Sequence, residues 1–484
     1  MSSLLKNNSD FIFALVLALL GVFIFFPGAM SGDSVDQWRQ VQTPDQIGNW
    51  FPPIMVYLWI LINKITYGPQ GMLVFHYVFY FFSIYIFGKV FINKLSNRWI
   101  YIFFIGMFPP IFFLTGVIWK DVSLLVGIAM SIALLLLFEK TRKKLFLIFS
   151  LIFFVYGISV RHNGLICSVP YSCYLVSLLL KKDIGCRSYY FCLSVFIMII
   201  CFFMTSTFLS NYKVKDVWKT YHFENAVFLW DLWGMSIELD ENIIPSYVFN
   251  EKSQDLGVDT LKNYYNSQSN SIIFLMQFLT KKRFKKDFPN TQFKKDFVKA
   301  IIKHPVAYIK VRGRFTLYML GYRLPIQPFI FRVPRFDKKH YLYRFSKGLE
   351  FSNPEVIAVA DKAAKYLFYN TPLWRVWIYI VLALLQVIIL VFCNRDKRDK
   401  KGLLLILSVG LIYWLPYPII SPATDFRFSN LTIFCSVLVL PFSVRCLFHM
   451  LRGNTPVSVT NEDGRKISPL CEADHSTLKS DLVV

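Results

Sequence analysis

The stretch "FIFALVLALLGVFIFFPGAMSGDSVDQWRQ", residues 11–40, opens with a run of about twenty apolar residues and ends with two carboxylates, Asp33 and Asp36. A run of this length is what an α-helix needs to cross the hydrocarbon core of a bilayer. No small-residue cleavage site follows it and further apolar runs do, which indicates a retained span and not a cleavable signal. The two acids are therefore expected where a membrane helix meets water.

Apolar runs of similar length recur along most of the 484 residues, of which 55% are hydrophobic. Only helices and closed barrels satisfy every backbone polar group in lipid, and these runs are continuous instead of alternating. The pattern predicts an all-α polytopic membrane protein with about ten transmembrane helices. The predicted spans are 10–30, 71–89, 98–116, 122–138, 144–160, 164–180, 188–209, 372–393, 402–419 and 430–448.

A further apolar segment, "NWFPPIMVYLWILINKITYG" at 49–68, is shorter and begins with Pro52-Pro53. Its length favours a helix that lies in the membrane interface over one that crosses. If it does not cross, all the strongly basic short loops and both termini fall on one side, which the positive-inside rule assigns to the cytoplasm. The strongly basic loops are 139–145, 181–187 and 394–401, and 89–98 is a weaker fourth that falls on the same side.

This topology divides the chain into four parts. Residues 1–210 form seven spans with an outer loop at 31–70 that carries the interfacial helix, and 371–450 form three more spans. Between them, 211–370 is rich in aromatic and basic residues and is expected to form a mainly helical domain on the outer face. The polar tail 451–484 is expected to be cytoplasmic and disordered.

Motifs for several kinds of chemistry are missing from the sequence. The nine cysteines contain no CxxC pair, so neither a zinc site nor a disulfide framework is indicated. There is no GxGxxG, no P-loop and no serine or cysteine nucleophile motif, and no nucleotide cofactor is therefore expected. The net charge of +23 suits anionic lipid or an anionic substrate, whereas nucleic acid is a poor partner for a chain this apolar.

Charged and amide side chains gather at the outward junctions of the predicted spans. Ionisable residues at membrane depth indicate functional sites, and arginine forks match phosphate oxygens. Three cations near a pair of acids therefore predict a phosphate-binding pocket with a base. The residues concerned are Asp33, Asp36, Lys120, Asp121, Arg161, His162, Asn163, Asp425 and Arg427.

Each of these residues also has a structural interpretation. The two acids can cap the next helix or solvate a loop. Arg161 can extend to the interface as a membrane-anchoring side chain. His162 has no second histidine nearby, so structural packing is favoured over metal ligation, and Arg427 can form an ion pair with Asp425.

A phosphate site at the lipid interface points to a substrate carried on a polyprenyl phosphate. Its tail would lie in the bilayer while its head group entered an outer cavity. An acid beside it could deprotonate an acceptor hydroxyl as the sugar leaves the phosphate.

Four short motifs resemble, in order along most of the chain, those of the GT-C superfamily of polyprenyl-phosphate-sugar-dependent membrane glycosyltransferases. They are "GDSVDQW" at 32–38, "PPIFFLTGVIWKD" at 109–121, "RHNG" at 161–164 and "SPATDFRF" at 421–428. Within that superfamily they most resemble the phage-type, serotype-converting O-antigen glucosyltransferases. The domain 211–370 carries none of these motifs.

The resemblance implies a GT-C-like fold and a bacterial inner-membrane hexosyltransferase. Such an enzyme takes a hexose, here glucose, from undecaprenyl phosphate and attaches it to O-antigen or another surface glycan on the periplasmic face, a lipopolysaccharide modification. By resemblance, Asp33 is the first-loop catalytic base and Asp36 a second polar position. Donor-phosphate contacts are Lys120, Arg161 and Arg427, supported by Asp121, His162, Asn163 and Asp425. Some members bind a divalent metal, which these carboxylates neither require nor exclude.

Two other functions remain open. A flippase of lipid-linked sugars would use the same cations, but the charges gather at one face and no inverted repeat is visible. An O-antigen polymerase or ligase would also use outward arginines, but does not need the early acid pair. The expected partners are the lipid-linked donor, the glycan acceptor and membrane lipids, with a functional link to a lipid-glucose synthase and a flippase.

Overall fold

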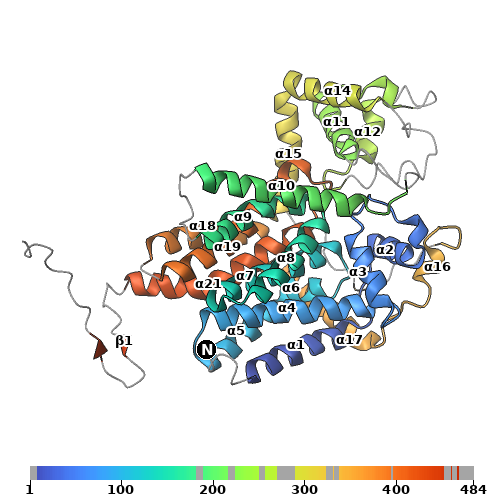
Figure 1. Ribbon diagram of the computed structural model, residues 1–484. Coiled ribbons are helices and arrows are strands. Elements are labelled where there is room, and N and C mark those ends of the chain that lie inside the picture. The colour runs from blue at the N-terminus through green and yellow to red at the C-terminus, as the bar shows by residue number, and fades with distance from the viewer. Residues whose placement is uncertain are drawn as a thin grey trace, which may run out of the picture.

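The most deeply buried long helix is α7, Lys120–Thr141, and 94% of its apolar window lies inside the protein. A helix that is apolar on every side is stable only when other helices surround it, and α4, α8 and α21 pack around α7 (Figure 1). The structure is a computed structural model. It describes residues 8–180, 189–215, 224–249, 257–269, 289–322, 331, 337–393, 396–451, 459–460 and 466–467.

The chain is helical almost throughout the described residues. The N-terminal part contains α1 (Ser9–Phe25), α2 (Gly32–Gln42), α3 (Ile54–Asn63), α4 (Gln70–Phe91), α5 (Leu95–Gly106), α6 (Pro109–Thr115), α7, α8 (Lys144–Ser159), η3 (His162–Cys167), α9 (Ser168–Leu180) and α10 (Tyr189–Asn211). The C-terminal part contains α18 (Val376–Phe392), α19 (Lys397–Trp414), α20 (Tyr417–Ile420), η8 (Phe426–Ser429) and α21 (Asn430–Leu451). Between them lie α11 (Asn225–Leu239), α12 (Val258–Tyr264), α14 (Asn290–Lys303), α15 (Pro305–Leu320), α16 (Tyr343–Ser346) and α17 (Pro354–Asn370), with further short 3-10 turns at 44–46, 246–248 and 372–374.

Six of these helices are long and apolar enough to cross a membrane, or seven if the bent pair α5–α6 counts as one span. The protein is therefore a multi-pass helical membrane protein with about six candidate spans. The ten predicted spans coincide with these six, the bent pair and three of the four shorter apolar helices, α1, α8 and α18. The fourth, α3, has ten residues and coincides with the predicted interfacial segment. The count of ten crossings stays a prediction.

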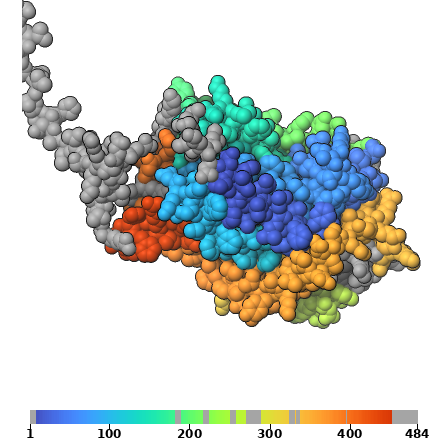
Figure 2. All heavy atoms as spheres, turned by 90° about the horizontal axis from the view of Figure 1, so that it is seen from below, coloured from blue at the N-terminus to red at the C-terminus, as the bar shows by residue number. Residues whose placement is uncertain are grey.

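Exposed apolar side chains identify the surfaces that face lipid. Along α1, Ile12, Val16, Leu19 and Phe23 are each more than half exposed and follow one stripe of the helix. Figure 2 shows α1, in dark blue, open along one face of the molecule with the orange segment of α17 beside it. In α10, only 6% of the apolar window is buried. Both helices lie at the edge of the bundle.

A close helix contact in the bundle joins α7 to α8 through two glycines. A Cβ added to Gly127 would lie 2.8 Å from the Cα of Gly157, and one added to Gly157 would lie 3.0 Å from the backbone nitrogen of Ile128. Small residues let membrane helices approach closely and gain dispersion contacts. Because the obstacle is backbone, a larger residue would force the helices apart.

We expect Gly127→Ala to lower the stability of the protein by about 1–3 kcal/mol, the usual cost of overpacking. Gly313 in α15 is the matched control, because a Cβ there would meet nothing within 4 Å. Gly313→Ala should leave stability unchanged or raise it by about 0.5–1 kcal/mol. Thermal unfolding of the two purified variants measures both effects. Equal unfolding midpoints for the two variants would contradict the close packing of α7 against α8.

The middle of the chain forms a helical layer, α11, α12, α14 and α15, that stands out from the bundle on the side of α10 (Figure 1). Trp230 and Trp233 on α11 are buried, and their indole N–H groups donate to the carbonyls of Asn266 and Leu261. The mainly helical character predicted for 211–370 agrees with the described part of this segment. The predicted basic loop 181–187 and most of the tail 451–484 lie outside the described residues, apart from the two-residue strands Val459–Thr460 and Lys466–Ile467.

This layer is joined to the bundle near residues 421–425. Arg312 of α15 donates to the carbonyl of Ser421 at 3.1 Å and pairs with the carboxylate of Asp231 at 2.8 Å. The backbone nitrogen of Thr424 donates to the carbonyl of Gln268 at 2.8 Å. The loop that precedes Arg427 is therefore held by the outer layer as well as by the bundle.

Candidate functional site

The first span ends earlier than predicted, and this changes the setting of the two acids. The helix α1 stops at Phe25, and the chain turns through Gly28, whose φ of +119° favours glycine. The acids then lie on a separate helix, α2, with Asp33 in its first turn. A negative charge there is stabilised by the helix N-terminus, so the expectation that these acids serve the start of the next helix is partly met.

The start of α2 is fixed against the segment that precedes α7. The backbone nitrogen of Ile118 donates to the carbonyl of Ala29 at 2.8 Å. Ser34 donates from its hydroxyl to the carbonyl of Ile118 at 2.6 Å, and the indole N–H of Trp119 donates to the hydroxyl of Ser31 at 2.8 Å. These contacts bring Asp33 beside the first residues of α7.

Arg427 connects three carboxylates that come from three parts of the sequence. Its guanidinium lies 3.3 Å from Asp33, 2.9 Å from Asp425 and 3.8 Å from Asp121. It also lies over the ring of Trp119, 4.7 Å from the ring centroid. The predicted ion pair with Asp425 is therefore present, but it is one of several contacts, and Asp33 belongs to the same cluster.

Asp121 is fully buried and balances a second arginine. It forms an ion pair with Arg161, which is itself buried and lies over the ring of Phe428 at 4.6 Å. A buried carboxylate is stable only when cations and hydrogen bonds compensate for lost hydration. Arg161 is therefore part of the site and does not extend to the interface as an anchor.

Lys120 is the cation of this cluster with the most freedom to bind a ligand. Its ammonium lies 3.7 Å from the centroid of the Phe51 ring, and Asp33, Arg161 and Arg427 are close enough to act on it electrostatically. No carboxylate lies within ion-pair distance of Lys120 among the residues that the structure describes. It is half-buried, so an anion that entered beside Asp33 would meet it directly.

Asp36 has a different environment from Asp33, although both lie on α2. Its two oxygens accept hydrogen bonds from Arg39 and Gln40, each at 2.9 Å. Tyr341, next to α16, lies close to the Asp36 side chain, and its ring centroid is 5.9 Å from the guanidinium carbon of Arg39. Asp36 is thus engaged with its own helix and the segment beside it, whereas Asp33 faces the arginine cluster.

The "RHNG" turn contributes more than its arginine. His162 contacts the backbone of Asn49 and Trp50, next to the ring that lies against Lys120. Asn163 lies close to Tyr417, whose hydroxyl donates to the hydroxyl of Tyr413 at 2.6 Å. These contacts fit the packing interpretation of His162 and make both side chains supports of the site.

The cluster contains equal numbers of positive and negative side chains, three of each. The three carboxylates, however, differ in how far they are exposed. The side chain of Asp33 is 43% exposed, against 17% for Asp425 and 0% for Asp121. Burial raises the pKa of Asp425, and the adjacent Arg427 opposes that rise. Asp33 is therefore the carboxylate of this cluster that an incoming molecule can reach. Among the described residues, no group of three or more His, Cys, Asp or Glu side chains could hold a metal ion.

Several residues of the site were not predicted from the sequence. Trp119 and Phe51 lie against the cations, and Tyr341 lies beside Asp36 from a position 305 residues later in the chain. Trp119 directly precedes Lys120-Asp121, and this adjacency is the only feature of the sequence that indicates its place in the site. Nothing in the sequence around Tyr341 marks it.

Comparison with family models and with curated proteins found no match for this chain. The fold and the site define the class of the protein. It is a multi-pass helical membrane protein with a charged cluster at one end of its bundle.

Proposed function

We propose that the protein is a bacterial inner-membrane glycosyltransferase of the GT-C type, which transfers a hexose from a polyprenyl phosphate to a surface glycan. The observation that carries the proposal is the partly exposed Asp33, held by Arg427 beside the half-buried Lys120. One accessible carboxylate and several cations at one end of an apolar bundle form the arrangement that a lipid-borne phosphosugar and a hydroxyl acceptor require.

In the proposed reaction, Asp33 accepts the proton of the acceptor hydroxyl. The acceptor oxygen bonds to the anomeric carbon of the hexose while the bond from that carbon to the phosphate oxygen breaks. Polyprenyl phosphate leaves with the negative charge, which Lys120 and the arginines stabilise. Asp121 holds Arg161 and Arg427 in position, and Asp425 fixes Arg427 from the other side.

The position of the cluster supports a lipid-linked donor. It lies where α2, the start of α7, the turn after α8 and the start of η8 meet, all at one end of the bundle. The basic segments near the ends of α4 and α7 lie at the other end, where Lys140 bonds to the carbonyl of Val90. By the positive-inside rule, that second end and both termini are cytoplasmic and the cluster is periplasmic.

A flippase remains the main alternative, with a polymerase or ligase next. A flippase needs to shield its cargo near the middle of the membrane, whereas the cations here gather with an accessible base at one end. Glucose as the hexose and O-antigen as the acceptor follow from the sequence resemblance.

The proposal is tested in a bacterial host with a defined lipopolysaccharide and a supply of polyprenyl-phosphate glucose. The O-antigen repeat should gain the mass of one hexose when the chain is expressed, and only when the donor supply is present. An unchanged repeat mass together with altered polymer length would instead favour a polymerase. An unchanged repeat and an unchanged polymer would refute the transfer reaction for this acceptor.

A further inference from the structure

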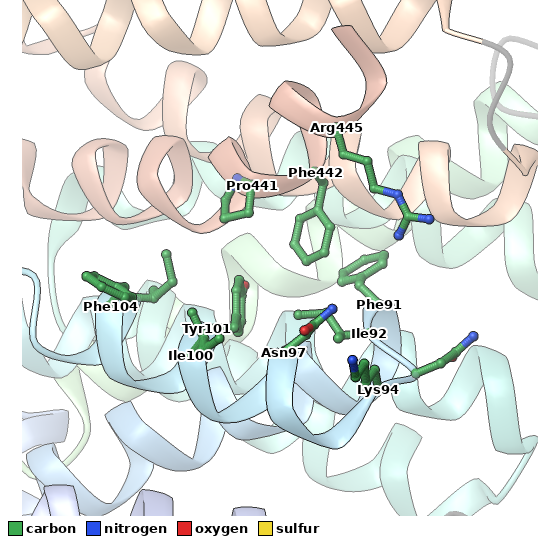
Figure 3. A pocket seen from close by; sticks show the side chains of 12 residues that line it. Phe91, Ile92, Lys94, Asn97, Ile100, Tyr101, Phe104, Pro441, Phe442 and Arg445 are labelled. Atoms are coloured by element: carbon green, nitrogen blue, oxygen red, sulfur yellow. The ribbon is translucent and has the colours of Figure 1, made fainter. Parts of the chain in front are cut away.

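A second site lies at the other end of the bundle. A cavity of about 630 Å³ separates the junction of α4 and α5 from the last turns of α21 (Figure 3). Helix α21 starts directly after the Arg427 turn, and Arg445 is fifteen residues further along it. At 1.5 Å per residue, the cavity is about 22 Å from the start of that helix. It cannot be part of the Asp33 cluster.

The cavity is polar and cationic on one side. Lys94 comes from the α4–α5 junction and Arg445 from α21, with Asn97 between them on the first turn of α5. Among the described residues, none of the side chains that line the cavity is acidic. No side chain caps the start of α5, so its first backbone N–H groups add to the positive potential.

Two neighbouring cations, unlike Lys94 and Arg445, form ion pairs inside the bundle. Lys89 and Arg98 both pair with Asp10, a fully buried carboxylate at the start of α1. Lys94 and Arg445 form no ion pair with any described residue, and both are exposed. The bundle thus neutralises one pair of cations internally and leaves the other pair at the mouth of a cavity.

The rest of the cavity is apolar and continues onto the lipid-facing surface. Tyr101 and Phe442 form its inner wall, with ring centroids 5.5 Å apart. Ile100 and Phe104, which also line it, are 56% and 67% exposed on α5. A ligand with an anionic head and an apolar chain matches this surface along its whole length.

We propose that this cavity binds an anionic phospholipid. The phosphate lies between Lys94 and Arg445, and one acyl chain runs along Ile100 and Phe104. Basic pockets between membrane helices bind lipid phosphates through charge-assisted hydrogen bonds, and arginine is well shaped for this role. The proposal is independent of the transferase reaction, because it uses none of the residues of the Asp33 cluster.

The test is native mass spectrometry of the purified full chain in detergent, titrated with phosphatidylglycerol. The wild type should retain one tightly bound lipid. In the double variant Lys94→Gln/Arg445→Gln, affinity should fall about 30-fold, as the loss of two cation contacts implies. Arg445→Gln alone should weaken binding about fivefold. Both side chains are exposed, so these variants are expected to fold.

The matched control is Lys143→Gln/Lys144→Gln, which removes two exposed cations at the start of α8 that do not line the cavity. This variant should bind phosphatidylglycerol like the wild type. An equal loss in both double variants, or no loss in either, would overturn the proposal. Displacement of the lipid by inorganic phosphate at similar concentration would also overturn it, in favour of a site for the free anion. Phosphatidylcholine should bind more weakly than phosphatidylglycerol, and equal binding would count against an anionic lipid.

Discussion

Asp33→Asn is expected to abolish hexose transfer while the protein remains folded in the membrane. Asparagine has nearly the same shape and keeps an oxygen that can accept a bond from Arg427, but it cannot accept the proton of an acceptor hydroxyl. Loss of a general base reduces rate by about 10²–10⁴-fold. The measurement is the fraction of O-antigen repeats that carry the added hexose, at matched protein level.

Asp36→Asn is the control on the same helix. Its oxygens accept from Arg39 and Gln40 and lie away from the arginine cluster, so most of the transfer activity should remain. The sequence alone could not separate these two acids, because they are three residues apart in one motif. If Asp36→Asn proves inactive and Asp33→Asn active, the assignment of the base is reversed.

Arg312→Met is expected to have the largest effect on stability. The substitution removes a buried cation that bonds to Asp231 and to the carbonyl of Ser421. Breaking a buried pair costs about 3–5 kcal/mol because the remaining charge is left without compensation. Arg314→Met, two residues along α15, is the matched control: its pair with Glu238 is exposed and contributes at most about 1 kcal/mol. Thermal unfolding followed by tryptophan fluorescence compares the two, and equal shifts would contradict the role of the buried pair.

The loss of stability caused by Arg312→Met should also become larger as the pH rises. Burial raises the pKa of Asp231 to about 7, and Arg312 opposes that rise. A carboxyl whose pKa is higher in the folded state than in the unfolded state favours folding when protonated, and that contribution is lost as pH rises through the folded pKa. Without Arg312 the folded pKa is higher still, so the variant continues to lose stability above pH 7 where the wild type has levelled off. A stability difference between wild type and variant that is constant between pH 6 and pH 9 would contradict a raised pKa of Asp231 as its cause.

The positions of the apolar helices could be predicted from the sequence because length and hydropathy determine them. The predicted spans coincide with apolar helices in the structure, and the segment at 49–68 becomes the short α3. The helix α1 ends five residues before the predicted end of the first span, because apolar residues continue beyond the turn at Gly28. Hydropathy reports which residues avoid water, and a backbone turn in an apolar run leaves that signal unchanged.

The partners within the site could be predicted only in part. Helix ends on one side of a bundle must lie near one another, so the meeting of Asp33, Arg161 and Arg427 follows from topology. Which carboxylate pairs with which arginine depends on side-chain packing: Asp33 and Arg427 are 394 positions apart, and nothing local couples them. The hydrogen bonds that fix the start of α2 against the segment before α7 are equally invisible in the sequence.

The most direct test of the central claim uses the purified protein in liposomes, with a polyprenyl-phosphate hexose and a lipid-linked glycan acceptor. We expect the wild type to release polyprenyl phosphate and form a glycan one hexose heavier, and Asp33→Asn to form neither product. Movement of the intact donor between leaflets, with no hexose transferred by either protein, would contradict it and identify the Asp33 cluster as part of a transport path.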